Sequence, residues 1–141
     1  MKHLNTIQKL IDKKDISLYA DASGDRNPIH LDDEFAANSY FSGVVAHGML
    51  TLAFVSEMLV GTFGVNWFET GSLKIRFKKP AYPGDRVHTE GEILNIKPGS
   101  CGDLVTCSVS LVDSDTGEAI ITGTASVTIR KDKTQNGCTY S

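Results

Sequence analysis

The chain has 141 residues, of which 40% are hydrophobic and 22% are charged, a composition typical of a folded globular protein and unlike that of a disordered chain. This length suits one domain with a core that needs no disulfide or metal to hold it together. The formal net charge of -3 at pH 7 argues against a general interface with nucleic acid or an anionic membrane, but it still permits a local basic patch that binds a small anion.

The cysteines and the hydrophobic stretches indicate in which cellular compartment we expect the protein. Cys101, Cys107 and Cys138 are odd in number and lack metal-ligand spacing, so we expect free thiols and a reducing, cytoplasmic compartment. The N-terminal residues carry scattered charges and lack the apolar core of a secretory signal. The apolar stretch Val44–Val65 is long enough to cross a membrane, but polar residues and glycines interrupt it. A buried helix is the better interpretation, and no membrane partner is expected.

The first half of the chain has the character of helices and loops. We expect a helix over 16–22 that is capped by Asp15 and ended by Gly24, followed by a turn over 24–28. A second short helix is expected over 33–40, with Asp32 as its N-cap and acidic residues in its first turn. A long helix is expected from His47-Gly48 to about residue 60, with Gly61 or Gly64 ending it. Because it is apolar nearly all round, it must be surrounded by protein.

The second half reads as strands. Residues 71–78 alternate between apolar and basic side chains, which predicts a strand with one wet face. Further strands are expected over 86–96, 104–113 and 118–130, with a hairpin turn at 114–117. An antiparallel sheet wrapped around a long central helix is the hot-dog fold. We therefore expect an α+β protein with a single hot-dog domain over residues 1–131 and a polar, frayed tail over 132–141.

The densest group of reactive side chains lies in Ser-Gly-Asp-Arg-Asn-Pro-Ile-His, residues 23–30. Asp25 and His30 stand on either side of a bend fixed by proline, and a carboxylate with an imidazole can hold one water and move its protons. The alternative is purely structural: Asp25 and Asn27 would cap turns, and His30 would be an ordinary structural histidine.

A second candidate group opens the long helix. Gly48 allows close approach to the backbone, and the free N–H groups of a helix N-terminus can hold a carbonyl oxygen as it gains negative charge. Ser56 lies a little over two turns further along and could point roughly the same way. The alternatives are that Gly48 only permits a sharp entry into the helix and that Ser56 bonds back to the helix. For His47 we expect a structural hydrogen bond.

These motifs resemble the signature of the MaoC-like, (R)-specific enoyl-CoA hydratases. The resemblance rests on residues 23–30, with Tyr19 upstream and Phe35-Ala36 downstream, and on Ala-His-Gly-Met at 46–49. The strand over 73–77 and the following Pro-Gly-Asp at 83–85 also fit. The resemblance covers about residues 15–130, nearly the whole domain.

The resemblance implies a homodimer that reversibly hydrates trans-2-enoyl thioesters to (R)-3-hydroxyacyl thioesters with no metal or other cofactor. By position, Asp25 and His30 would hold the reacting water, with Asp25 as the main base. The Gly48 N–H would bind the thioester oxygen, Ser56 would support the site by hydrogen bonding, and Asn27 would orient the loop.

The identity of the acyl carrier and two other functions stay open at this point. The substrate would be a thioester of coenzyme A or of acyl carrier protein. Lys74, Arg76 and Lys78 could meet its phosphates, although a solvated strand face is the favoured interpretation. A thioesterase on the same fold and a non-catalytic acyl-thioester binding module are the alternative functions.

Overall fold

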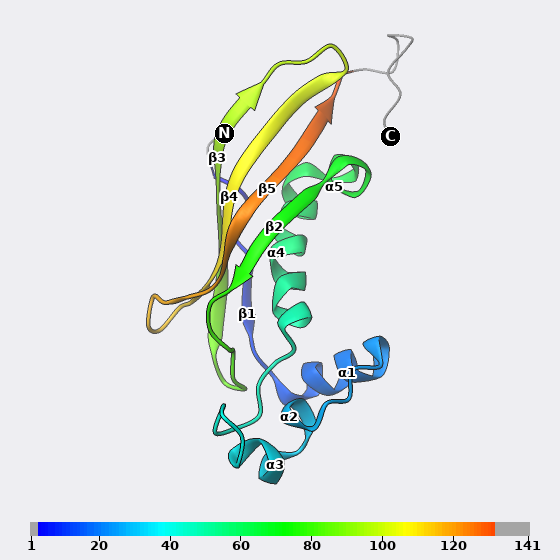
Figure 1. Cartoon of the computed structure of the whole chain (residues 1–141). Coiled ribbons are helices and arrows are strands. Elements are labelled where there is room, and N and C mark those ends of the chain that lie inside the picture. Colours follow the sequence, from blue (N-terminus) through cyan, green and yellow to red (C-terminus); the bar gives the residue numbers. More distant parts are fainter. Residues whose placement is uncertain (1–2, 132–141) are drawn as a thin grey trace.

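The computed structural model describes residues 3–131, which form one curved sheet and a set of helices (Figure 1). The predicted tail over 132–141 lies outside the described residues. In chain order the elements are β1 (Gln8–Leu10), α1 (Lys13–Ser23), α2 (Pro28–Leu31), α3 (Asp33–Ala37), α4 (Gly48–Phe63), α5 (Val65–Thr70), β2 (Ser72–Phe77), β3 (Arg86–Lys97), β4 (Gly102–Asp113) and β5 (Ala119–Arg130).

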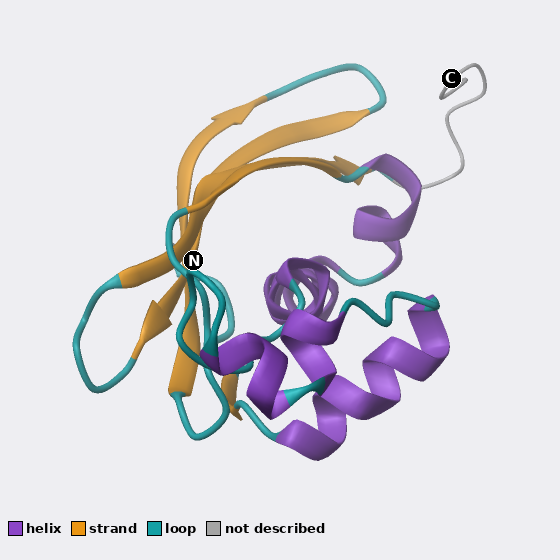
Figure 2. Cartoon of the chain, turned by 60° about the horizontal axis from the view of Figure 1, so that its bottom comes forward, coloured by secondary structure: helices purple, strands orange, loops and turns teal. Residues whose placement is uncertain are grey.

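The strands form one antiparallel sheet in the order β1-β3-β4-β5-β2. Figure 2 shows α4 nearly end-on with the sheet curving around it. Alternate residues along a strand face the same side, and the residues of β4 that face α4 are buried: Val105, Cys107, Val109 and Leu111. The predicted α+β hot-dog fold, with an antiparallel sheet wrapped around a long helix, is confirmed.

Helix α4 starts at the predicted residue and ends at Phe63, three residues after the approximate end predicted at Val60. Its C-cap is Gly64, one of the two glycines predicted to end it. The sheet buries one side of α4 at Thr51, Val55, Met58 and Leu59. The opposite side is open in the single chain, where Met49 is 58% exposed. The prediction that protein surrounds this helix is therefore wrong for one chain alone, because the sheet curves only partway around it.

The capping of α1 differs from the prediction. Asp12, not Asp15, is the N-cap, and its carboxylate accepts a hydrogen bond of 2.8 Å from the N–H of Lys14. The helix ends at Ser23, as predicted. Gly24 follows with φ 78°, a left-handed conformation that glycine adopts without steric cost.

The segment after α1 is more helical than predicted. The expected turn over 24–28 gives way at its last residue to the short helix α2, which was not predicted. Pro28 fits the first helical position, and the Asn27 side chain accepts the N–H of Ile29. Asp32 caps α3 as predicted, although α3 ends at Ala37, before the predicted residue 40. Helices α1, α2 and α3 gather beside the N-terminal end of α4 (Figure 1).

The sequence pattern predicts neither β1 nor α5. Strand β1 has three residues and is held by pairing with β3, a contact between segments distant in sequence. Helix α5 follows α4 directly after Gly64. The other strands match their predicted ranges to within one or two residues.

The cysteines only partly follow the expectation of free thiols. Cys107 is a free thiol in the core, where burial raises its pKa. Cys101 is disulfide-bonded, which corrects the expectation for that residue. Cys138 lies outside the described residues.

Within residues 3–131, none of the helices has the length and hydrophobicity that a membrane-spanning segment requires.

A buried carboxylate fastens the β4–β5 hairpin to the segment after β2. Asp113 is only 6% exposed and accepts hydrogen bonds from the N–H groups of Asp115 and Thr116. Its second oxygen lies 3.5 Å from Lys79 Nζ, which also bonds Glu118 at 2.8 Å. Burial acts to raise the pKa of Asp113, but the two N–H bonds and the Lys79 charge outweigh it and lower the pKa.

Asp113→Asn is therefore expected to lower the free energy of unfolding by about 1–3 kcal/mol at pH 7. Because folding lowers the pKa of Asp113, its stabilisation is present above the ordinary carboxyl value of about 3.9 and is lost as pH falls through the folded value. Denaturant titrations of both proteins at pH 7 and at pH 3 measure this, and the gap should shrink at pH 3. Asp115→Asn, at an exposed position of the same turn, is the control. An equal gap at both pH values would rule out the charged form as the cause.

Candidate active site

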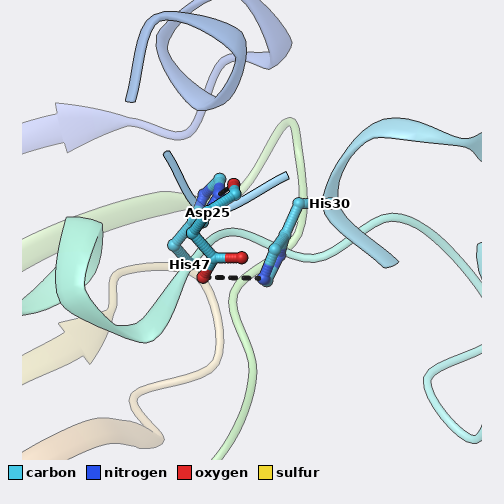
Figure 3. Close-up of side chains that lie close together, drawn as sticks. All are labelled: Asp25, His30 and His47. Carbon is cyan, nitrogen blue, oxygen red and sulfur yellow. Dashed lines mark hydrogen bonds and ion pairs between the residues drawn. The ribbon is translucent and has the colours of Figure 1, made fainter. Parts of the chain in front are cut away.

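Asp25 and His30 face each other across the bend between α1 and α2 (Figure 3). The distance from Asp25 Oδ2 to His30 Nε2 is 4.0 Å. This is too long for a direct hydrogen bond, yet a single water at about 2.8 Å from each atom would bridge them. The structure thus brings together the carboxylate and the imidazole at a spacing that suits one water.

Backbone contacts fix the orientation of both groups. His30 Nδ1 lies 2.7 Å from the carbonyl oxygen of Val45. Since a carbonyl only accepts, Nδ1 carries the proton, and Nε2 of the neutral ring is the acceptor that faces Asp25. Asp25 Oδ1 accepts the N–H of Asn27 at 3.2 Å, which leaves Oδ2 directed toward His30. The His30 side chain is 10% exposed and that of Asp25 is 53% exposed.

His47 supports this pair from behind. Its Nε2 donates to the backbone oxygen of Asp25 at 2.9 Å, and its ring stacks on that of His30 with 3.8 Å between centroids. The rings of His47 and Tyr19 also make an edge-to-face contact, with 4.8 Å between their centroids. His47 is fully buried, so it ties the Asp25 loop to the start of α4 and does not reach solvent.

His30 and Gly48 line one pocket of about 340 Å³. Its walls are mostly apolar, with two lysines at one side. The other lining residues are Ile29, Phe41, Val45, Ala46, Thr51, Phe77, Lys78, Lys79, Pro80 and Ala81. Gly48 is the first residue of α4, where N–H groups have no partner within the helix. A hydrogen-bond donor and His30 therefore meet at the same pocket. Asp25 does not line this pocket, but its carboxylate lies 4.0 Å from His30.

Two other predicted residues take different places. Asn27 does not line the pocket; it caps α2 and receives the side-chain contact of Asp25, so it shapes the loop. Ser56 also does not line the pocket. At 100° per residue it lies on the side of α4 that the sheet leaves open, near Met49 and Ala53.

Sequence reasoning missed two contributors to the site. The Val45 carbonyl sets the tautomer of His30, a role that only the folded backbone reveals. The Phe77 ring packs so close to Gly48 that a Cβ there would lie 3.1 Å from Phe77 Cε1. The alternation of the predicted strand places Phe77 on the apolar face, and this was the available signal for it.

The cluster could also hold a metal ion. Donor atoms of Asp25, His30 and His47 lie within 4.8 Å of one another. One nitrogen of each ring is already bonded to a backbone carbonyl, and a metal would take the remaining His30 nitrogen and the Asp25 carboxylate. Those are the two groups that acid–base chemistry on a water requires.

Comparisons with known proteins identify the family of this chain. The sequence matches the family described as MaoC like domain over residues 2–115. A 3-hydroxybutyryl-CoA dehydratase of Methylorubrum extorquens is 30% identical over 125 residues, which span 89% of this chain and 77% of that protein. An (R)-specific enoyl-CoA hydratase of Rhodospirillum rubrum is 29% identical over 130 residues, spanning 88% of this chain and 83% of that protein.

A solved structure of a related protein has the same fold. The (R)-hydratase from A. caviae involved in PHA biosynthesis superposes with a TM-score of 0.77 at 26% identity, covering 92% of this chain and 94% of that one. The family match spans most of the chain and includes the whole segment from Asp25 to Gly48. The protein therefore belongs to the MaoC-like dehydratase family.

Proposed function

We propose that this protein reversibly hydrates trans-2-enoyl thioesters to (R)-3-hydroxyacyl thioesters. The observation that carries the proposal is the 4.0 Å gap between Asp25 Oδ2 and His30 Nε2, beside a pocket that His30 and Gly48 line. The relatives named as a 3-hydroxybutyryl-CoA dehydratase and an (R)-specific enoyl-CoA hydratase support a hydro-lyase acting on thioesters.

The reaction adds one water across a conjugated double bond. As the water oxygen attacks the β-carbon, Asp25 takes its proton as the main base, and His30 accepts a hydrogen bond from the same water. The proton that Asp25 has taken then passes to the α-carbon, so the Asp25 carboxylate returns to its starting state. Because a single water is held on one side of the substrate, its oxygen and its hydrogen add to the same face of the double bond.

The negative charge that develops on the thioester oxygen needs a donor. The N–H of Gly48 at the start of α4 supplies one in a partly enclosed site, where such a donor is worth more than in water.

A homodimer is part of the proposal. Strand β2 forms one edge of the sheet and presents unpaired backbone groups to a further strand. Exposed apolar side chains lie on elements near this edge, including Met49, Phe68 and Phe77. Light scattering coupled to size-exclusion chromatography measures the mass directly, and a monomer at micromolar concentration would contradict the dimer.

Gly48→Ala is expected to lower kcat/KM for crotonyl-CoA by roughly 10- to 100-fold. The new Cβ would lie 3.1 Å from Phe77 Cε1, which is closer than side chains normally pack. Either the Phe77 ring or the start of α4 must therefore move, and both lie at the pocket. Steady-state kinetics measure the loss. Gly61→Ala is a matched control in the same helix, where the added Cβ has only Asn5 within 4.0 Å. Wild-type kinetics in the Gly48 variant would remove this end of α4 from the site.

The functional test follows crotonyl-CoA by two readouts at once. Loss of the enoyl-thioester absorbance without release of free thiol identifies hydration. Released thiol identifies a thioesterase instead, and ligand binding without either signal identifies a binding module. Either of these last two results would overturn the proposed function.

A further inference from the structure

Three basic side chains lie on strand β2 or directly after it, in a protein whose net charge is -3: Lys74, Arg76 and Lys78, together the β2 cation row. All three are exposed. They occupy alternate positions, so Lys74 and Arg76 share the face of the sheet turned away from α4, and Lys78 continues the row just beyond the strand.

No carboxylate of the described residues forms an ion pair with any member of the row. On the neighbouring strand β5, Lys74 lies opposite Thr124 and Arg76 opposite Thr122, which add hydroxyl groups but no negative charge. Elsewhere in the described part of the chain, Lys9 and Lys13 are each paired with a carboxylate. The row therefore concentrates positive charge that the protein itself does not neutralise.

The row begins at the pocket of the proposed active site. Lys78 lines this pocket together with His30 and Gly48. Lys79 lines it as well, but its ammonium group is held by Glu118 at 2.8 Å and by Asp113 at 3.5 Å. Lys78 is thus the available cation at this end, and Lys74 lies four residues away, about 13 Å along an extended strand.

We infer that the β2 cation row binds the phosphate groups of the substrate's pantetheine carrier. The inference rests on the proposed function, because it takes a thioester as the ligand. The pantetheine arm separates the reacting thioester from the carrier phosphates, so these phosphates would lie outside the pocket, past the side where Lys78 lines it. A carrier with phosphates at both ends of its nucleotide, as in coenzyme A, can contact several members; a phosphopantetheine arm carries a single phosphate.

Such contacts act on binding and not on the chemical step. The row is exposed and remote from the reacting carbons, so each contact contributes modestly and equally to ground state and transition state. Removing one cation is expected to raise KM for crotonyl-CoA about two- to fivefold at unchanged kcat. Removing all three is expected to raise it by about tenfold or more if the effects add.

The test compares the wild type with a triple variant, Lys74→Ala, Arg76→Ala and Lys78→Ala, on three thioesters. Crotonyl-CoA and the crotonyl thioester of an acyl carrier protein carry phosphate, whereas crotonyl-pantetheine does not. The triple variant should raise KM for a phosphorylated substrate and leave KM for crotonyl-pantetheine within about twofold. The phosphorylated substrate with the larger increase identifies the carrier. Lys97→Ala, an exposed strand lysine outside the pocket, is the matched control and should not change any KM.

Two outcomes would overturn the inference: unchanged KM for both phosphorylated substrates, or an equal rise for crotonyl-pantetheine, which would mean that the row only shapes the pocket. Failure of the wild type to hydrate all three thioesters is a failure of the proposed function instead. In that case, calorimetry with adenosine 3′,5′-bisphosphate tests the row alone. Weaker binding by the triple variant supports the phosphate subsite, and equal binding overturns it.

Discussion

Asp25→Asn should lower kcat for crotonyl-CoA hydration by about 10²–10⁴-fold while the protein stays folded. The amide cannot take the proton of the water that lies between this residue and His30. It can still accept the Asn27 N–H through its oxygen, so the loop keeps its geometry. Steady-state rates, with circular dichroism to check the fold, measure the effect.

The control for this variant is Asp15→Asn, which makes the same chemical change at an exposed position of α1. It should turn over crotonyl-CoA at the wild-type rate. An Asp25→Asn enzyme within threefold of the wild type would remove this carboxylate from the proton transfer.

His30→Ala should also lower kcat by about 10²–10⁴-fold, because the variant lacks the nitrogen that faces the water. The change has a structural cost too, since the Val45 carbonyl loses its donor and the His47 ring loses its stacking partner. We expect a loss of about 1–3 kcal/mol in unfolding free energy. Added imidazole should restore part of the rate, and this rescue separates a role in catalysis from a loss of stability.

His88→Ala is the matched histidine control. His88 bonds Ser114 and Glu90 and does not line the pocket, so its loss should leave turnover unchanged. If His30→Ala keeps the wild-type rate, the water must be held by other groups and the mechanism is wrong.

The central parts of the fold were predictable because their patterns are local. The length and hydrophobicity of α4 and the alternation along β2 are readable from adjacent residues. The cap of α1 was also readable, although the prediction chose the wrong residue. Ile11 and Ile16 flank Asp12 at the positions of a hydrophobic staple and are both buried, which would have favoured Asp12 over Asp15.

The parts that could not be predicted depend on contacts between distant segments. Strand β1 exists only through its pairing with β3. The open side of α4 depends on how far the sheet curves, which no local pattern encodes.

The candidate site shows the same division. The sequence motif identified Asp25 and His30 as a pair, but the 4.0 Å spacing and the Val45 contact that orients His30 are tertiary facts. Ser56 does not line the pocket, although its spacing along α4 suggested roughly the same direction as Gly48, and its supporting role stays a prediction.

The most direct test of the account is the stereochemistry of hydration in D₂O. One water held by Asp25 and His30 must deliver oxygen to the β-carbon and a deuteron to the α-carbon from the same face. We therefore expect a single syn-addition product with the (R) configuration at the β-carbon, observed by NMR of the 3-hydroxybutyryl thioester formed from crotonyl-CoA. A mixture of configurations at the deuterated α-carbon, or an (S) product, would contradict a single water held by this pair.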